Sequence, residues 1–431
     1  MDVLFYSKLP SNRLAYIVSF LFDNLLGASC ILSNNIGEYQ SFNGIKINYS
    51  DSQISTNELW IKPHTLLFEQ GIKEQKIEIN FISGLAILFA EESNTDFNFD
   101  PFASSFYLLS RYEEYLPYKK DKHGRFSASQ SLAYKSDFIE QPIIHLWLKQ
   151  LVIALQKKYA TFKPKPTIYA FKPTYDIDIP WAFKHRGIRG WLRAGLDLTS
   201  AKWPLIKARY QVQIGQKRDP FYCFEHLKSQ HAKYGIQPQI FWLIGNASKE
   251  DINPDYQLTV FQNLIRSTAA WSNSGLHPSY QSNKKLNLLQ IEKTRLENIL
   301  QQTITHSRQH FLKLRLPQTY RQLLKAGIQH DYSMGFADSV GYRAGTSEAF
   351  FWYDLEKETR TGLQIHPFVA MDVTLRQYFG FSPDEAKKKL KELQDFCKKN
   401  GLTFSTLWHN SSFSSLHGWE GWDAIYWKLF E

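Results

Sequence analysis

The sequence predicts an α/β protein of two parts, and three observations favour this. Short apolar segments alternate with segments of helical period along the second part of the chain, which is typical of a parallel sheet or barrel. Polar residues of catalytic type recur where the apolar segments end, and in α/β folds sites concentrate at the carboxyl ends of strands. The chain has 431 residues, more than one domain usually contains.

Residues 1–160 are expected to form a smaller α+β domain, although an α/β arrangement also fits. Alternating segments at 44–49 and 76–81, bounded by Gly, Asn and Ser, indicate strands. Helices are expected at about 12–26, 104–115 and 141–158. No catalytic constellation stands out here, so we interpret this part as an accessory domain. The Lys-Pro-Lys-Pro run at 163–166 is the expected linker, because its prolines end any helix.

Residues 165–431 are expected to form the larger domain, in which strands and helices alternate. Strands are expected at 168–176, 238–244, 274–277, 308–314, 363–371 and 402–409. Helices are expected at 222–234, 256–271, 286–302, 318–326 and 384–399. This alternation predicts a parallel sheet or a barrel.

An acidic pair, Asp176 and Asp178, stands where the first of these strands stops. Side chains at i and i+2 of a strand share a face, so both carboxylates point to one side. Two carboxylates so close together raise each other's pKa unless a cation lies nearby or the two carboxylates have different roles. The usual solution makes one a metal ligand and the other a proton acceptor. A turn that simply contains two Asp is the plain alternative.

Further residues of catalytic type stand at or near the ends of later segments. They are His277, Arg308, His310, Arg343, Asp372 and His409. His277 ends one expected strand, Asp372 directly follows another, and His409 ends the last. Such a series favours one shared site over unrelated surface residues.

Residues 165–431 resemble the polysaccharide deacetylase family, the chitin and peptidoglycan N-deacetylases. Its motifs occur in order: an acidic pair after Thr, a loop with His, a segment with Arg, an apolar strand ending in Asp, and a strand ending in His. Gly-Leu-His-Pro-Ser-Tyr, Ser-Arg-Gln-His-Phe-Leu, Gly-Tyr-Arg-Ala-Gly-Thr and Trp-His-Asn, with the run at 106–115, look like a bacterial subgroup that carries an extra N-terminal domain. The resemblance implies a distorted (β/α) barrel of seven strands.

The resemblance also implies a metal-dependent hydrolase that removes an acetyl group, N-acetyl or O-acetyl, from a sugar of a polysaccharide or lipid-linked glycan. A divalent metal would polarise the acetyl carbonyl and lower the pKa of its water to about 7. Asp178 and His277 would hold the metal, which we expect to be zinc or another divalent ion such as cobalt. Asp176, kept off the metal, would take the proton of the water.

The remaining roles concern the leaving group and the base. His409 would protonate the departing amine, and Asp372 would support the imidazolium; both roles rest on the resemblance and on strand-end position. Arg308 or Arg343 would keep Asp176 ionised and oriented, since a neighbouring cation favours a charged carboxylate. For either arginine, a salt bridge at the surface or in a loop is the plain alternative.

The metal site departs from the family pattern at one position. The second motif usually supplies two His ligands at i and i+4, but the position four after His277 is Gln281, a poor metal ligand. Either a third ligand comes from elsewhere or the site is incomplete. His310 is predicted to be this ligand because it lies on the adjacent alternating segment; a core or surface His is the alternative.

A basic insert at 182–220 is longer than the family core needs. Between 184 and 218 it contains nine Lys and Arg, with Asp197 as the sole acid, interleaved with Trp and Leu. This composition suits an anionic membrane surface or an anionic glycan carrier. A solvated helical excursion that packs its apolar side on the barrel is the simpler interpretation.

Composition narrows the class of protein. The hydrophobic fraction of 43% is globular, and the net charge of +10 comes without a nucleic-acid motif, so nucleic acid is not an expected partner. Three scattered Cys form neither metal spacing nor a disulfide framework. The N-terminus lacks a secretory signal, and Asp23 and Asn24 interrupt the most apolar stretch. We expect a soluble cytoplasmic protein, at the inner membrane face if the insert contacts lipid.

Two other functions stay open at this point. A non-catalytic glycan-binding or assembly protein on the same fold would explain the missing i+4 His. Against it, the base, the acid and their partners are all present at matched places. A hydrolase of another C–N bond, such as a small cyclic amide, would use the same chemistry in a differently sized pocket. The sugar, the linkage and the oligomeric state are not predicted.

Overall fold

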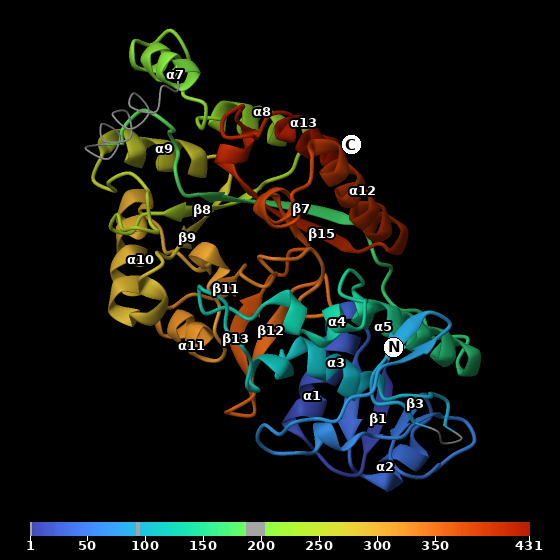
Figure 1. Cartoon of the computed structure of the whole chain (residues 1–431). Helices are drawn as coiled ribbons and strands as arrows, with labels where there is room; N and C mark the ends of the chain where they lie inside the picture. Colours follow the sequence, from blue (N-terminus) through green and yellow to red (C-terminus); the bar gives the residue numbers. More distant parts are fainter. Residues whose placement is uncertain (1, 92–94, 187–202) are drawn as a thin grey trace.

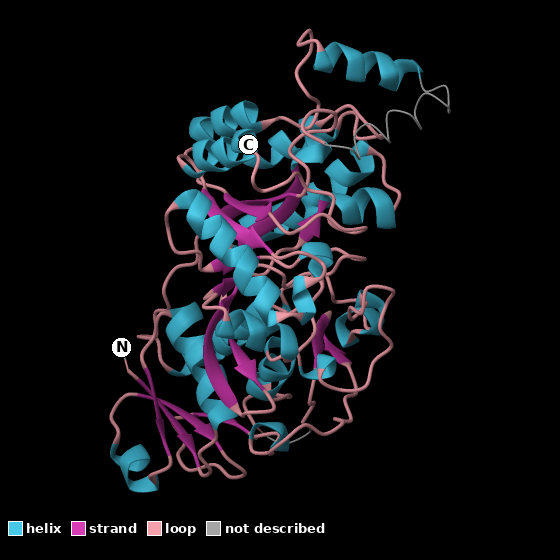
Figure 2. Cartoon of the chain, turned by 90° about the vertical axis from the view of Figure 1, so that its left-hand side faces the viewer, coloured by secondary structure: helices cyan, strands magenta, loops and turns pink. Residues whose placement is uncertain are grey.

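The computed structural model describes residues 2–91, 95–186 and 203–431. Two sheets organise the described chain, a four-stranded sheet near the N-terminus and a nine-stranded sheet beyond it. In Figure 1 the small sheet lies at the bottom in blue, and the large sheet lies above it with helices on its outer side. Figure 2 shows the same two sheets, in magenta, after a turn of 90° about the vertical axis.

The N-terminal part has a parallel sheet in the order β2-β1-β3-β4. Its strands are β1 (Val3–Ser7), β2 (Cys30–Ser33), β3 (Ile45–Tyr49) and β4 (Leu59–Ile61), and a separate hairpin contains β5 (Asn80–Ile82) and β6 (Leu85–Ile87). Its helices are α1 (Asn12–Ser19), α2 (Ile36–Ser41), α3 (Pro101–Leu109), α4 (Leu132–Lys135) and α5 (Ile143–Lys158). Helices connect β1 to β2 and β2 to β3, and the paired strands are parallel, so this part is α/β and the expected α+β class was wrong.

Local sequence explains where these helices begin. The side chain of Ser11 accepts a hydrogen bond from the backbone of Leu14 and caps α1, which a π-helix continues over Phe20–Leu26. Asp100 caps α3 and is followed by a proline at the first helical position. The expected helix at 12–26 is therefore an α-helix that continues as a π-helix.

The large sheet has the order β12-β13-β11-β10-β9-β8-β7-β15-β14. Its strands are β7 (Ala170–Ile177), β8 (Gln239–Leu243), β9 (Asn273–His277), β10 (His306–Ser307), β11 (His330–Asp331), β12 (Phe350–Asp354), β13 (Thr359–Ile365), β14 (Ala370–Met371) and β15 (Thr403–His409). All neighbours pair in parallel except β12 with β13. Among the described residues the strands do not close into the expected seven-stranded barrel, because β12 and β14 are unpaired edges.

One expected strand, at 308–314, is absent. Only His306–Ser307 pair with neighbours, and the chain then forms a short 3-10 turn at His310–Leu312. Phe311 and Leu312 both have left-handed backbone, with φ of 60° and 50°. The alternation of apolar and polar residues that indicated a strand therefore belongs to a turn.

The helices agree closely with the expected ranges. They are α8 (Phe224–Tyr234), α9 (Thr259–Ala269), α10 (Leu286–Leu300), α11 (Gln318–Lys325) and α12 (Pro383–Asn400). A short α13 (Trp422–Trp427) was not expected. Helix α12 begins at a capping box of Ser382 and Glu385 and ends at Gly401 in the left-handed conformation. In the described part of the chain, every helix is too short or too polar to span a bilayer.

The two parts of the chain share one continuous apolar core. Arg13 of α1 is buried and donates from Nε to Oε2 of Glu358, at 2.9 Å, in the turn before β13. A buried charge of this kind is tolerated because its partner and two backbone carbonyls satisfy it. The N-terminal part is thus packed against the large sheet (Figure 1).

The basic insert is described only in part. Residues 187–202 lie outside the described residues, and with them the centre of the predicted 182–220 insert. The described remainder includes α7 (Trp203–Gln213), which carries exposed Trp203 and Tyr210. Figure 1 shows α7 beyond the helices that cover the sheet.

Candidate active site

The predicted site residues gather at the carboxyl ends of neighbouring parallel strands. Asp176 is the second-to-last residue of β7, and Asp178 directly follows the strand. His277 ends β9, His409 ends β15, and Asp372 directly follows β14. Arg308 and His310 follow β10. Because carboxyl ends of parallel strands meet at one edge, residues more than two hundred positions apart share one site.

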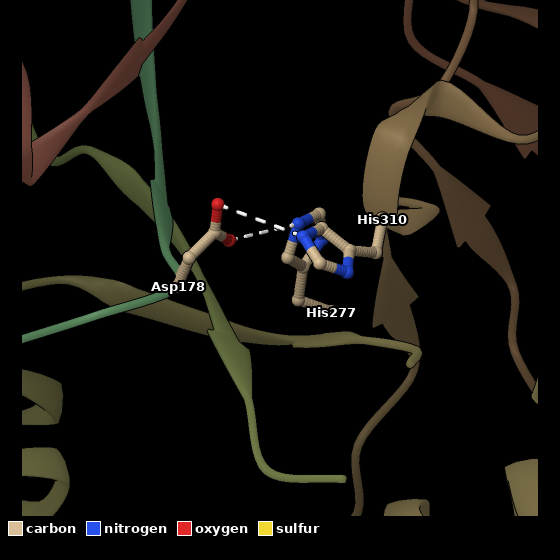
Figure 3. Close-up of side chains that lie close together, drawn as sticks. All are labelled: Asp178, His277 and His310. Carbon is tan, nitrogen blue, oxygen red and sulfur yellow. Dashed lines mark ion pairs between the residues drawn. The ribbon is translucent and has the colours of Figure 1, made fainter. Parts of the chain in front are cut away.

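Asp178, His277 and His310 form a compact group that could hold a metal ion. Nε2 of His277 lies 3.2 Å from Oδ1 of Asp178, and Nε2 of His310 lies 3.7 Å from its Oδ2. Figure 3 shows the carboxylate facing both imidazoles. Ligands of a tetrahedral ion with bonds of about 2.0–2.1 Å are roughly 3.3 Å apart, so this spacing fits one ion.

Hydrogen bonding fixes the proton of His277. Its Nδ1 lies 2.6 Å from the carbonyl oxygen of Arg308, which can only accept, so Nδ1 carries the proton. In neutral His277 the lone pair of Nε2 then faces the carboxylate of Asp178. Oδ1 of Asp178 is shielded from solvent, and no donor among the described residues makes a hydrogen bond to it. Two lone pairs that face each other in a buried place require either a cation between them or a second proton on the ring.

His310 is held in the same way by a carboxylate that the sequence did not indicate. Its Nδ1 lies 2.8 Å from Oδ1 of Asp251, a fully buried residue in the loop after β8. Asp251 also accepts the backbone N–H of Tyr280 and the hydroxyl of Ser248. A carboxylate that orients a histidine ligand through its other nitrogen is the usual support of a metal site. The only sequence clue was the place of Asp251 after a strand.

Charges in the cluster are mutually stabilising. Burial alone would raise the pKa of Asp178, but His310 and His277 outweigh it and hold that pKa well below its usual range. Burial would lower the pKa of His310, yet Asp178 and Asp251 raise it to about 9. The site therefore favours positive charge at the point where the imidazoles and the carboxylate meet.

Asp176 is held beside this cluster by Arg308. Nη1 of Arg308 donates to Oδ1 of Asp176 at 2.9 Å, and Nη2 donates to the hydroxyl of Thr174 at 2.6 Å. Asp176 and Arg308 are almost completely buried. The second oxygen of Asp176 lies 3.6 Å from Nε2 of His277. One oxygen is thus fixed, and the other faces the cluster.

The second arginine named from the sequence, Arg343, is engaged elsewhere. Its Nε and Nη2 donate to the two carboxylate oxygens of Glu114 at 2.8 and 2.6 Å, and Nη1 donates to the carbonyl of Gly335. Glu114 comes from the N-terminal part of the chain and is buried. The expected alternative that Arg343 holds Asp176 is corrected by this pairing, and of the two arginines it is Arg308 that contacts that carboxylate.

His409 and Asp372 form a second anchored pair. Nδ1 of His409 lies 2.8 Å from Oδ1 of Asp372, which is fully buried and also accepts the backbone N–H groups of Val373 and His409. Nε2 of His409 therefore points to the cluster, 3.9 Å from Asp178. Burial would lower the pKa of His409, but Asp372, followed by Asp178 and Asp176, raises it to about 10. The imidazole is held as a proton donor.

A cavity of about 460 Å³ opens onto these residues. Its apolar wall consists of Leu312, Ala337, Met371 and Leu407, which belong to a small separate apolar cluster. Lys122, His123 and Arg125 from the N-terminal part also line the cavity. A polar cluster beside an apolar wall is typical of a site for a small organic group.

Comparisons with known families match one part of the chain. Residues 3–160 match the model of a family of unknown function, DUF7033. No curated protein matches the chain in sequence.

Several solved structures are similar to the chain in fold. A candidate polysaccharide deacetylase from Mycobacterium smegmatis has 14% sequence identity and a TM-score of 0.39, with 62% of this chain and 85% of the other covered. A candidate polysaccharide deacetylase from Pseudomonas aeruginosa PAO1 has 10% identity and a TM-score of 0.40, with 61% and 84% covered. A CE4 family pseudoenzyme from Bacillus anthracis has 11% identity and a TM-score of 0.31, with 62% of each chain covered.

Proposed function

We propose that this protein is a metal-dependent hydrolase that removes an acetyl group from a sugar of a polysaccharide or lipid-linked glycan. The observation that carries the proposal is the orientation of three imidazoles. In His277, His310 and His409 the Nδ1 atom is bonded away from the site, and the Nε2 atom faces Asp178. His277 and His310 are suited to be metal ligands, and His409 is suited to be a general acid.

Asp178, His277 and His310 would hold the metal. One carboxylate and two imidazoles suit zinc or a similar divalent ion such as cobalt, and leave a coordination position open. Bound there, the ion supplies Lewis-acid chemistry: it polarises a carbonyl and lowers the pKa of water to about 7. Asp251 orients His310, and the carbonyl of Arg308 orients His277, each through a hydrogen bond to Nδ1.

Asp176 is proposed as the general base. Its fixed oxygen is bonded to Arg308, so the other oxygen is directed at the cluster and can accept a proton from the attacking water. Arg308 occupies Oδ1 of Asp176, so Oδ2 is the oxygen left for the base role. Asp178, which Arg308 does not hold, is left for the ligand role.

His409 is proposed as the general acid. Asp372 keeps its Nδ1 bonded and its ring positively charged, so Nε2 can give a proton to the leaving nitrogen of the sugar. The same donor would serve the oxygen of an O-acetyl group. The apolar wall at Leu312, Met371 and Leu407 is suited to the acetyl methyl group, while the open side of the cavity admits the sugar.

Release of acetate from N-acetylated sugar oligomers, measured with and without added zinc, tests the proposal. Asp176→Asn should lower turnover by roughly 10²–10⁴-fold, the usual worth of a general base, while the protein still binds metal. Wild-type protein that binds zinc and releases no acetate from any acetylated glycan or acetyl sugar would contradict the deacetylase assignment. It would favour a C–N hydrolase with a different substrate or a binding protein.

A further inference from the structure

A loop of the N-terminal part, residues 119–126, reaches the proposed site. Its two arms pair at Lys120 and Phe126, and Oδ1 of Asp121 accepts the backbone N–H groups of His123 and Arg125 at its tip. Lys122, His123 and Arg125 line the same cavity as Asp178. The wall on this side of the cavity therefore comes from the part of the chain that shows no catalytic pattern.

The 119–126 loop contacts the turn that carries His310. Phe311 and Leu312, directly after His310, both have positive φ. Two consecutive bulky residues rarely adopt this backbone, which persists only where the surroundings enforce it. Since the position of the His310 ring depends on this backbone, whatever enforces the turn also places Nε2 of His310.

Arg125 makes a buried side-chain contact with this turn. Its Nη1 donates to the carbonyl oxygen of Phe311 at 2.8 Å, and Nη2 donates to the hydroxyl of Tyr378 at 3.0 Å. Its Nε is held by Oδ2 of Asp121 at 2.7 Å, and its side chain is only 9% exposed. The guanidinium thus joins the His310 turn to the segment that follows Asp372.

His123 adds a second hold on the same turn. Its ring centroid lies 4.8 Å from that of Phe311, and its Nδ1 lies 3.3 Å from the hydroxyl of Tyr280. Tyr280 in turn donates its backbone N–H to Asp251, the carboxylate that orients His310. Both routes from the loop therefore end at His310.

We propose that Arg125 is a positioning residue of the active site, and that the 119–126 loop holds the His310 turn in the geometry that metal binding requires. This inference rests on the proposed function for the role of His310. It makes the N-terminal part a structural component of the site and not a separate accessory domain. The chemistry is unchanged: Arg125 lies outside the proposed ligand set and acts through the backbone of Phe311.

The test compares Arg125→Gln and Arg125→Lys with a matched control in the full chain. Arg13→Gln is the control, because Arg13 is also a buried arginine that joins the N-terminal part to the large sheet, but at Glu358, before β13 begins. Cobalt affinity by absorption titration, hydrogen exchange of the segment 308–314 and melting temperature are measured on each protein. Lysine can reach one of the acceptors, so it should give an intermediate result.

Arg125→Gln should weaken cobalt binding by about tenfold, within the 10–100-fold range for residues that orient ligands, and speed exchange at the 308–314 turn. Arg13→Gln should lower the melting temperature and leave both quantities unchanged. Unchanged exchange and cobalt affinity in Arg125→Gln, or equal losses in Arg13→Gln, would overturn the inference. If wild type binds no cobalt, the proposed function fails instead, and exchange at the turn still decides the role of Arg125.

Discussion

Nε2 of His277 lies 3.2 Å from Oδ1 of Asp178, while Nδ1 of the same ring donates its proton to the carbonyl of Arg308. Such a pair is stable in a buried place only with a positive charge between the two atoms or with a second proton on the ring. His310 repeats the arrangement against the other oxygen of Asp178. Metal affinity is therefore the property that depends most directly on this geometry.

Asp251→Asn tests the support of His310. An amide at this position cannot offer the charged acceptor that keeps the Nδ1 proton in place, so metal affinity should fall by about 10–100-fold. Asp255→Asn in the same loop is the matched control, since Asp255 is exposed and accepts only a backbone N–H within its turn. Zinc competition with a chromogenic chelator measures both. Equal affinities of the two variants would remove Asp251 from the site.

Arg308 and Arg343 are both buried and paired with carboxylates, but only Arg308 contacts the base. Either change to Met leaves a buried carboxylate short of a partner and should cost about 3–5 kcal/mol of the free energy of unfolding. Turnover per folded molecule should fall roughly 10²-fold or more only for Arg308→Met, because Asp176 loses its fixed orientation. Denaturant unfolding and acetate release on the same preparations measure the two effects. A similar loss of turnover in Arg343→Met would contradict the assignment.

Asp372→Asn tests the acid through the pH profile. Asp372 is the main cause that raises the pKa of His409 to about 10 against the lowering effect of burial. With an amide there, the pKa of His409 should fall, so the protonated donor should be lost at lower pH. The basic limb of the rate profile should then move to lower pH, and His409→Ala should lose about 10²–10⁴-fold in turnover. A basic limb that stays in place in Asp372→Asn would mean that another group sets it.

Three imidazoles at neighbouring strands, His306 in β10, His330 in β11 and His366 directly after β13, predict that the stability of the fold is sensitive to acid. His306 and His330 stack with centroids 4.3 Å apart, and Nδ1 of His330 lies 3.1 Å from Nε2 of His366. Burial, then the charge of neighbouring groups, lowers the pKa of His306 to about 4 and that of His366 to about 3. Because the unfolded chain binds these protons near its pKa of about 6.5, the free energy of unfolding should fall as pH drops below that value.

His366→Phe should reduce this acid sensitivity. A phenyl ring can keep the stacking on Tyr332, whose centroid lies 4.3 Å away, without taking up a proton. The slope of unfolding free energy against pH between about 6.5 and 4 should be shallower than in wild type. His226→Gln, at an exposed position, serves as the control. An unchanged slope in His366→Phe would show that other groups cause the acid response.

The sequence predicted what depends on local pattern. Helices α8 to α12 follow their apolar periodicity, and Asp176, Asp178, His277 and His409 stand at strand ends that the topology joins. The turn at His310–Leu312 was misread as a strand because its alternation resembles one, and two left-handed residues leave no mark in composition. Asp251 and Arg125 were missed because their partners are 59 and 186 positions away in the chain. Contacts of that kind follow from the tertiary structure alone.

Metal content of purified protein, with Asp178→Asn and Asp176→Asn beside it, tests the central claim. Wild type should retain about one divalent ion per chain after equilibrium dialysis against zinc or cobalt. Asp178→Asn should lose the ion, because it removes the shared carboxylate, whereas Asp176→Asn should keep it. Wild-type protein without bound metal at every zinc and cobalt level tested would contradict the claim. It would mean that protons on His277 and His310 supply the positive charge that Asp178 faces.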